Sequence, residues 1–108
     1  GALGRGDIGE HFSNKEPRWI GVSSLVLLEE VMRMAEKDGY KIVNADIAVL
    51  AEEPPIHVHK AEMKERIAKR LKIGADCINI KATTNEKLGA VGRGEGIAAF
   101  ATVLLKKG

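Results

Sequence analysis

The sequence predicts a single domain over residues 1–108 with an α+β fold, in which one β-sheet carries helices packed on one face. Helical periodicity alternates with strand-like runs in the order helix, strand, helix, strand, loop, strand. The last strand is apolar on both faces, and a chain of 108 residues has no spare helices to cover it. We therefore expect the open face of the sheet to pack against further copies in a symmetric oligomer.

Composition narrows the class of protein. Apolar residues make up 44% of the chain and aromatic residues only 4%, so the core must be aliphatic. A net charge of +2 is too small to indicate a nucleic-acid partner. No apolar run has the length of a membrane span, and no signal peptide is visible. The single cysteine, Cys77, excludes an internal disulfide and fits a reducing compartment, so we expect a cytoplasmic protein without a membrane partner.

The first half of the chain is predicted to hold a loop, a helix and a strand. Residues 4–21 lack periodicity and form the loop, which Trp19 anchors onto the helix that follows. Ser23 or Ser24 caps this helix and Gly39 ends it. Residues 41–51 alternate as a strand does. One face of this strand would carry Ile42, Asn44, Asp46, Ala48 and Leu50, and the other would carry Val43, Ala45, Ile47 and Val49.

The second half is predicted to hold a helix and two strands. The pair Pro54-Pro55 stops the first strand. Residues 60–71 form an amphipathic helix that Gly74 ends, with Met63, Ile67 and Leu71 facing inward. Residues 76–82 and 96–106 form the remaining strands, and Cys77 packs within the first of these two.

The most polar stretch of the chain, residues 83–96, joins these two strands. Two hydroxyls precede a carboxylate, a lysine, and four glycines around Arg93. Hydroxyls, backbone amides and an arginine can hold phosphate oxygens, and a carboxylate among them suggests a shared divalent cation. The alternative is a simple turn, because the segment GRGEG matches neither the dinucleotide fingerprint nor the P-loop pattern.

Four segments together resemble one enzyme family. They are GDIG at residues 6–9, NAD at 44–46 running into AEEP at 51–54, KATTNEKLG at 81–89 and GRGEGIA at 92–98. With these segments the whole chain resembles the 2-C-methyl-D-erythritol 2,4-cyclodiphosphate synthases of the non-mevalonate isoprenoid pathway.

The resemblance implies a phosphorus–oxygen lyase. Such an enzyme cyclises 4-diphosphocytidyl-2-C-methyl-D-erythritol 2-phosphate to 2-C-methyl-D-erythritol 2,4-cyclodiphosphate and releases CMP. It also implies a homotrimer whose three sheets pack around a central axis, with each active site between neighbouring subunits. Zn²⁺ and either Mg²⁺ or Mn²⁺ would hold the phosphates, and the central cavity could hold an isoprenoid diphosphate.

The resemblance also assigns residues. Thr84 would be catalytic, Thr83 and Asn85 would complete the phosphate loop, and Glu86 would hold Mg²⁺ or Mn²⁺ between the nucleotide phosphates. The cytidine pocket would comprise Ala51, Glu52, Glu53, Pro54, Pro55, Ile56 and His57. The methylerythritol end would be bound by Asp7, Ile8, Gly9, Phe12, Ser13, Asn14, Lys15 and Glu16. The central cavity would be lined by Ala90 and Arg93.

Three departures from the family pattern stand out. The family's zinc ligands lie in a leading segment that the chain lacks, so no residue here inherits the zinc. We therefore expect an N-terminally incomplete domain with little activity by itself. Pro55 stands where a lysine is usual, and Ala90 stands where an aromatic residue is common.

Two other functions are compatible with the residues. One is a catalytically inactive trimeric homologue that binds an isoprenoid diphosphate or a cytidine nucleotide. The other is an unrelated α+β nucleotide-binding domain, in which Asp7 would be only a turn residue. The pair His57 and His59 lacks the further ligands that a metal site needs, and we expect both to be loop residues.

Overall fold

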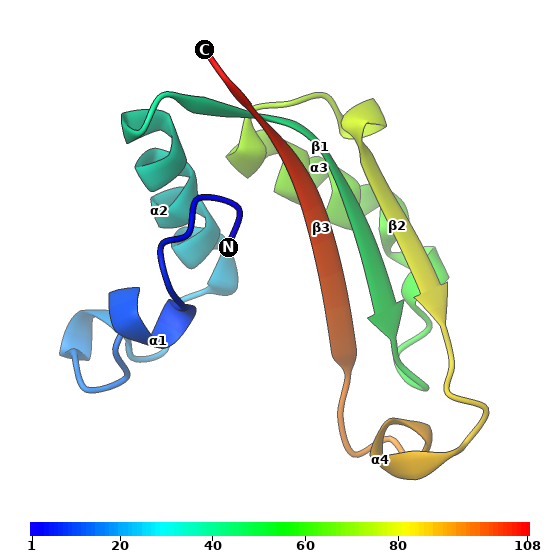
Figure 1. The fold of residues 1–108 in the computed structure, drawn as a ribbon. Coiled ribbons are helices and arrows are strands. Elements are labelled where there is room, and N and C mark those ends of the chain that lie inside the picture. The colour runs from blue at the N-terminus through cyan, green and yellow to red at the C-terminus, as the bar shows by residue number, and fades with distance from the viewer.

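A three-stranded sheet organises the computed structural model, which describes all of residues 1–108 (Figure 1). The central strand β1, Tyr40–Leu50, pairs in parallel with β2, Ile78–Thr83, and antiparallel with β3, Ala98–Lys107. The order β2-β1-β3 places the last strand of the chain at one edge. The predicted α+β class is confirmed.

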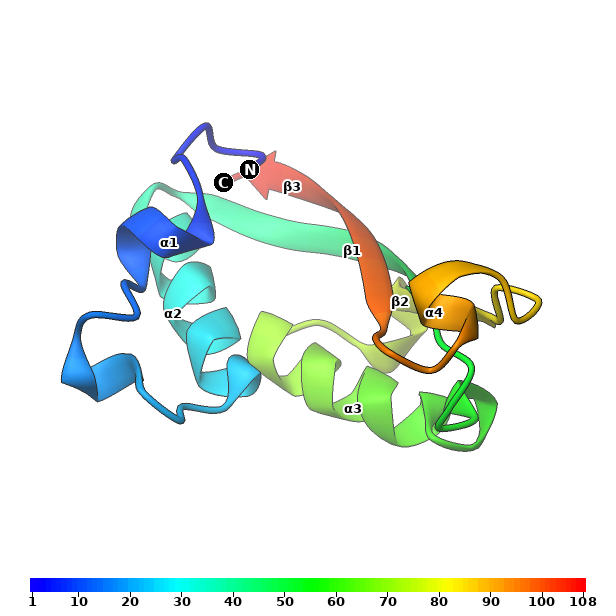
Figure 2. The same cartoon turned by 90° about the horizontal axis from the view of Figure 1, so that it is seen from below.

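Two long helices lie on the same side of the sheet (Figure 2). Helix α2, Ser24–Lys37, begins as predicted, with the Oγ of Ser23 accepting the amide of Leu25 at 3.2 Å. Helix α3, Lys60–Leu71, joins β1 to β2 and makes the parallel pairing possible. The predicted range 60–71 is confirmed, but the residue that ends the helix is Lys72, whose φ of 58° is left-handed, and not the predicted Gly74.

The core between helices and sheet is aliphatic, as composition predicted. Its buried members are Met32, Ala45, Val49, Ala51, Ala68, Leu71, Ile78 and Ile80. Only nine of the 108 residues are buried, so a single copy leaves much of its apolar surface exposed. Met63 and Ile67 of α3 pack against this core as predicted.

A β-bulge changes the faces of β1 at its start. The pairing with β3 shifts between Ile42 and Asn44, and Ile42 packs against the core while Val43 is 37% exposed. An inserted residue reverses the alternation on one side of a bulge. The predicted faces are therefore correct from Asn44 onward and wrong for Ile42 and Val43.

The first segment holds short helices that periodicity did not predict. They are α1, Ile8–His11, and the 3₁₀ helix η1, Pro17–Trp19. Trp19 meets Phe12 edge-on, with ring centroids 5.0 Å apart, and the Arg18 guanidinium lies 4.4 Å from its ring centre. These aromatic and cation partners of Trp19 belong to the same segment. Hydrogen bonds tie the segment to the end of α2 instead through Arg5, which donates to the Asp38 carboxylate at 2.6 and 2.9 Å.

Three further short helices complete the fold: η2, Ile56–Val58; η3, Ala75–Cys77; and α4, Gly89–Gly92. Because Cys77 lies in η3, β2 begins at Ile78 and not at the predicted residue 76. The Cys77 side chain is half-buried there. None of the helices has both the length and the apolar character that a membrane crossing requires.

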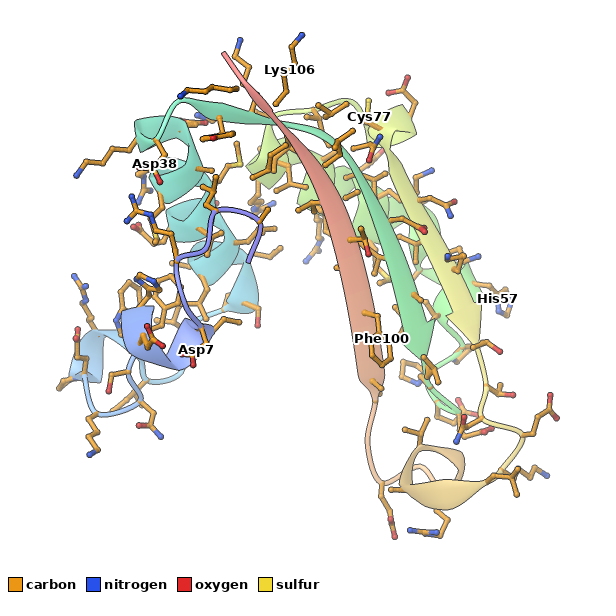
Figure 3. The ribbon with its side chains drawn as sticks, in the orientation of Figure 1. Asp7, Asp38, His57, Cys77, Phe100 and Lys106 are labelled. Atoms are coloured by element: carbon orange, nitrogen blue, oxygen red, sulfur yellow. The ribbon has the colours of Figure 1, made fainter.

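The sheet face opposite the helices is uncovered. Phe100, labelled on β3 in Figure 3, is 66% exposed, and Leu104 on the same strand is 54% exposed. Beside them on the same face, Asp46 of β1 accepts from Asn79 Nδ2 at 3.0 Å and from Lys81 Nζ at 2.9 Å. These bonds hold the pKa of the Asp46 carboxyl below its ordinary value. The bond from Lys81 has the largest effect, and the bond from Asn79 the next largest.

Candidate active site

The candidate site lies where the parallel strands β1 and β2 end. Parallel strands deliver their carboxyl ends to one edge, the place where α/β sheets bind ligands. Here the amide of Ala51 donates to the carbonyl of Thr83 at 3.1 Å, so the segments that follow both strands start side by side. Between them is a cavity of about 280 Å³. It is lined by Ala51, Pro55, Ile56, His57, Ala82, Thr83 and Thr84.

The cavity unites two of the predicted blocks. Four residues of the proposed cytidine segment, Ala51, Pro55, Ile56 and His57, form one wall. The end of β2 and the start of the polar loop, at Thr83 and Thr84, form the other. A larger cavity of about 390 Å³ lies between α2 and α3. Both of its carboxylates are already paired, with Arg70 3.3 Å from Glu29 and Lys72 2.9 Å from Glu36.

The hydroxyl hydrogen of Thr84 makes no hydrogen bond within the protein. Its Oγ1 accepts the amide of Glu86 at 3.3 Å, and its carbonyl accepts the hydroxyl of Thr83 at 3.1 Å. A hydroxyl that accepts one bond can still donate its own hydrogen to a second group. Thr84 is exposed at the cavity and can therefore donate to an anionic oxygen.

The backbone amides that follow Thr84 are already bonded within the protein. The amides of Asn85 and Lys87 both donate to Oε1 of Glu52 at 3.0 Å, and the amide of Leu88 donates to the Asn85 carbonyl at 2.9 Å. With the bond from Glu86 to Thr84, four successive amides have partners. Because these four amides have partners within the protein, side chains are the donors left available for phosphate oxygens.

Glu86 could hold a magnesium or manganese ion. Its carboxylate is exposed and makes no hydrogen bond or ion pair, and it projects from a turn in which Glu86 and Lys87 have φ values of 53° and 61°. Mg²⁺ is commonly bound through one or two carboxylates together with substrate phosphates. A single free carboxylate on the residue whose amide bonds to the Thr84 hydroxyl fits that kind of site.

The residues do not fit a zinc ion. A catalytic zinc site takes three protein ligands. No group of three or more histidine, cysteine, aspartate or glutamate side chains is placed to hold a metal, and the pair His57 and His59 has no third ligand.

Arg93 lies outside the cavity, just past α4. Its Nη2 donates to Oε2 of Glu95 at 3.0 Å, and both side chains are more than half exposed. Ala90, at the start of the same short helix, is also exposed. The residues predicted to face a central cavity thus share one exposed tip of the molecule, with the arginine already paired.

The predicted block at residues 7–16 lies far from the cavity. Asp7, just before α1, and His57, at the cavity, lie on opposite sides of the molecule (Figure 3). The carboxylate of Asp7 caps α1 by accepting the amide of Glu10 at 2.9 Å, and Ser13 accepts the amide of Lys15 at 3.2 Å. One copy of the chain therefore cannot bring this block to Thr84, and a site using both needs a second copy.

The resemblance assigns Glu52 to the cytidine pocket, but Glu52 does not line the cavity, and its carboxylate instead accepts the amides of Asn85 and Lys87. These bonds join positions 33 and 35 residues apart, and no local pattern marks such a contact.

Known proteins share both the sequence and the structure. The model of the YgbB family matches residues 1–106. The chain is 50% identical over 107 residues to a 2-C-methyl-D-erythritol 2,4-cyclodiphosphate synthase from Geotalea uraniireducens, covering 99% of this chain and 68% of that protein. The chain thus spans about two thirds of the length of this relative, and it spans 65% and 62% of the length of two further synthases, from Syntrophotalea carbinolica and Desulfosudis oleivorans.

Solved structures of related proteins have the same fold as this chain. The bifunctional IspDF from Campylobacter jejuni superposes with a TM-score of 0.93 at 38% identity, covering 99% of this chain and 29% of that one. A CDP complex of IspF from Plasmodium falciparum gives a TM-score of 0.85 at 34% identity, covering 99% and 64%.

Proposed function

The chain belongs to the YgbB family, and from this premise we propose that it works as a 2-C-methyl-D-erythritol 2,4-cyclodiphosphate synthase. The reaction joins the 2-phosphate of 4-diphosphocytidyl-2-C-methyl-D-erythritol 2-phosphate to the β-phosphorus of the diphosphate. The bond from that phosphorus to the CMP oxygen breaks, and CMP leaves as the cyclic diphosphate forms. One observation carries the proposal: the cavity between residues 51–57 and Thr84 sits at the carboxyl ends of β1 and β2.

Thr84 is the proposed catalytic residue. Phosphoryl transfer depends on positioning and on stabilising charge that moves between oxygens. The free hydrogen of the Thr84 hydroxyl can donate to a phosphate oxygen, while its Oγ1 is fixed by the amide of Glu86. Thr83 and Asn85 complete the loop, with Nδ2 of Asn85 tied to the Leu88 carbonyl at 2.8 Å.

Glu86 is the proposed ligand for Mg²⁺ or Mn²⁺ at the nucleotide phosphates. A bound ion of this kind neutralises phosphate charge and orients the oxygens. Glu86 contributes an exposed carboxylate two residues after Thr84, which lines the cavity. No step is assigned to zinc, because the residues present do not form a zinc site.

Residues 51–57 are proposed to bind cytidine. The cavity wall they form is mostly apolar and backbone, with Ala51, Pro55 and Ile56 beside His57. Apolar walls with a few polar groups are typical of small-molecule sites. The similarity to a protein solved as a CDP complex supports this assignment.

A homotrimer is proposed from the uncovered sheet. Phe100 and Leu104 expose apolar surface that three sheets around a central axis would bury. Such an assembly would let residues 7–16 of one copy bind the methylerythritol end at the cavity of another. Arg93 would face the central axis, where an isoprenoid diphosphate would have to compete with Glu95 for it.

The test is to supply the substrate with Mg²⁺ and to follow the phosphorus NMR spectrum of the full-length protein's reaction. The expected products are CMP and a cyclic diphosphate in equal amounts. Hydrolysis to linear phosphates, or no CMP, would contradict the proposal.

Two further expectations stay predictions. Limited proteolysis tests whether residues 1–108 form a single domain, and cell fractionation tests the cytoplasmic location.

A further inference from the structure

Glu52 bridges the two segments whose residues line the cavity. It lies two residues after the end of β1, and its half-buried carboxylate reaches across to the loop that follows β2. One oxygen, Oε1, accepts from the amides of both Asn85 and Lys87 at 3.0 Å. The side chain therefore links two segments that only the fold brings together.

These bonds put a protein carboxylate where the loop would otherwise bind an anion. Successive amides that converge in a turn with left-handed residues form a concave site for negative charge. The loop has this geometry, because two neighbouring residues have positive φ and the amides on either side of Glu86 point at one oxygen. Glu52 fills that concavity.

The loop also needs something to hold it. Glu86 and Lys87 are not glycines, and positive φ is costly for residues with a Cβ. Such conformations persist only where the surroundings fix them. The bonds to Glu52 lie on both sides of Glu86, so they fix the backbone from which its carboxylate projects.

We propose that Glu52 is a positioning residue: its carboxylate occupies the anion site of the loop amides and holds Glu86 in place for the divalent cation. The substrate phosphates are thereby directed to the Thr84 hydroxyl and the cation, and away from the loop amides. This role rests on the proposed function and differs from the contact with cytidine expected from the sequence.

Three variants test it: Glu52→Ala, Glu52→Gln, and Glu65→Ala as a control. Glu65 lies exposed on α3 and makes no hydrogen bond or ion pair. The first readout is amide hydrogen exchange by NMR without ligand. Glu52→Ala should speed exchange of the Asn85 and Lys87 amides by about tenfold or more and leave the amides of β1 unchanged. Glu52→Gln keeps an acceptor oxygen and should restore protection, and Glu65→Ala should match the wild type.

The second readout is Mn²⁺ affinity in the presence of CDP, by titration calorimetry. Glu52→Ala should shift the Mn²⁺ titration to concentrations about tenfold higher. Unchanged exchange at the two amides, or faster exchange with unchanged Mn²⁺ affinity, would overturn the proposal, as would failure of Glu52→Gln to restore protection. If the wild type itself binds no CDP, the proposed function fails and the positioning role fails with it, even where exchange shows the contact to be real.

Discussion

Gly92, at the end of α4, lies directly against the backbone of Lys87. A Cβ at Gly92 would stand 2.7 Å from the Lys87 Cα and 2.9 Å from its carbonyl oxygen, closer than real Cβ atoms approach. The backbone of Lys87 therefore packs against α4 and also donates its amide to Glu52. Both contacts hold the turn that carries Glu86.

Replacing Gly92 with alanine should disturb this turn. The new methyl group meets backbone, which cannot move aside as a flexible side chain can, and overpacking of this kind costs about 1–3 kcal/mol. Urea unfolding should show the loss of stability, and exchange of the Lys87 amide should accelerate. Gly96→Ala is the matched control, because Gly96 has open space around it. Equal stability of the two variants would show that the loop is not packed as described.

Thr84→Ala should lower turnover more than it raises the KM of the substrate. A donor whose bond strengthens as charge moves acts mainly in the transition state, and losing one costs about 10²–10³-fold in rate. Steady-state kinetics of the full-length enzyme measure the split between kcat and KM. Thr84→Ser keeps the hydroxyl and should retain most of the activity. Unchanged turnover in Thr84→Ala would make the loop a structural turn.

Asp46 should make stability depend on acid pH. Its pKa is lowered, first by the bond from Lys81 and then by that from Asn79. A lowered carboxyl pKa gives stability that is present above the unfolded pKa and is lost as pH falls through the folded pKa. Asp46→Asn should therefore flatten the fall in stability below about pH 4.

Urea unfolding across this pH range measures the effect, with Glu65→Gln as the control for loss of a carboxylate without a partner. The effect should be small, since Asp46 and Lys81 are both exposed. An Asp46→Asn variant with an unaltered acid slope would show that the bonds to Lys81 and Asn79 do not form in solution.

Phe100→Glu should break the proposed trimer. Phe100 is 66% exposed on the open face, so the change costs a single copy little while it places a charge where three sheets would meet. Sedimentation should show monomers for this variant and trimers for the wild type. Val26→Glu, on α2 and 41% exposed, is the control and should remain trimeric. A wild-type protein that is monomeric up to millimolar concentration would contradict the assembly.

The parts of the fold that depend on nearby residues could be predicted from the sequence. The pattern predicts a cap at Ser23 or Ser24, of which the structure uses Ser23, and it predicts the range of the helix at residues 60–71, because capping and periodicity are local. The bulge after Ile42 and the left-handed end of α3 at Lys72 were missed, because partner strands and packing decide them.

The candidate site likewise has parts that local sequence predicts and parts that it does not. The motifs identified Thr84 and Glu86, but the partners of the loop amides could not be foreseen. Glu52 meets the loop only because α3 brings the ends of β1 and β2 together. The sequence also could not show that residues 7–16 lie across the molecule from the cavity (Figure 3).

Titration calorimetry with CDP and with ADP, each in the presence of Mg²⁺, tests the central claim most directly. A cytidine pocket at residues 51–57 beside the phosphate-binding Thr84 predicts that CDP binds at least about tenfold more tightly than ADP, a difference of about 1.4 kcal/mol. Equal affinities for the two nucleotides would contradict it, because the cavity would then recognise diphosphates without reading the base.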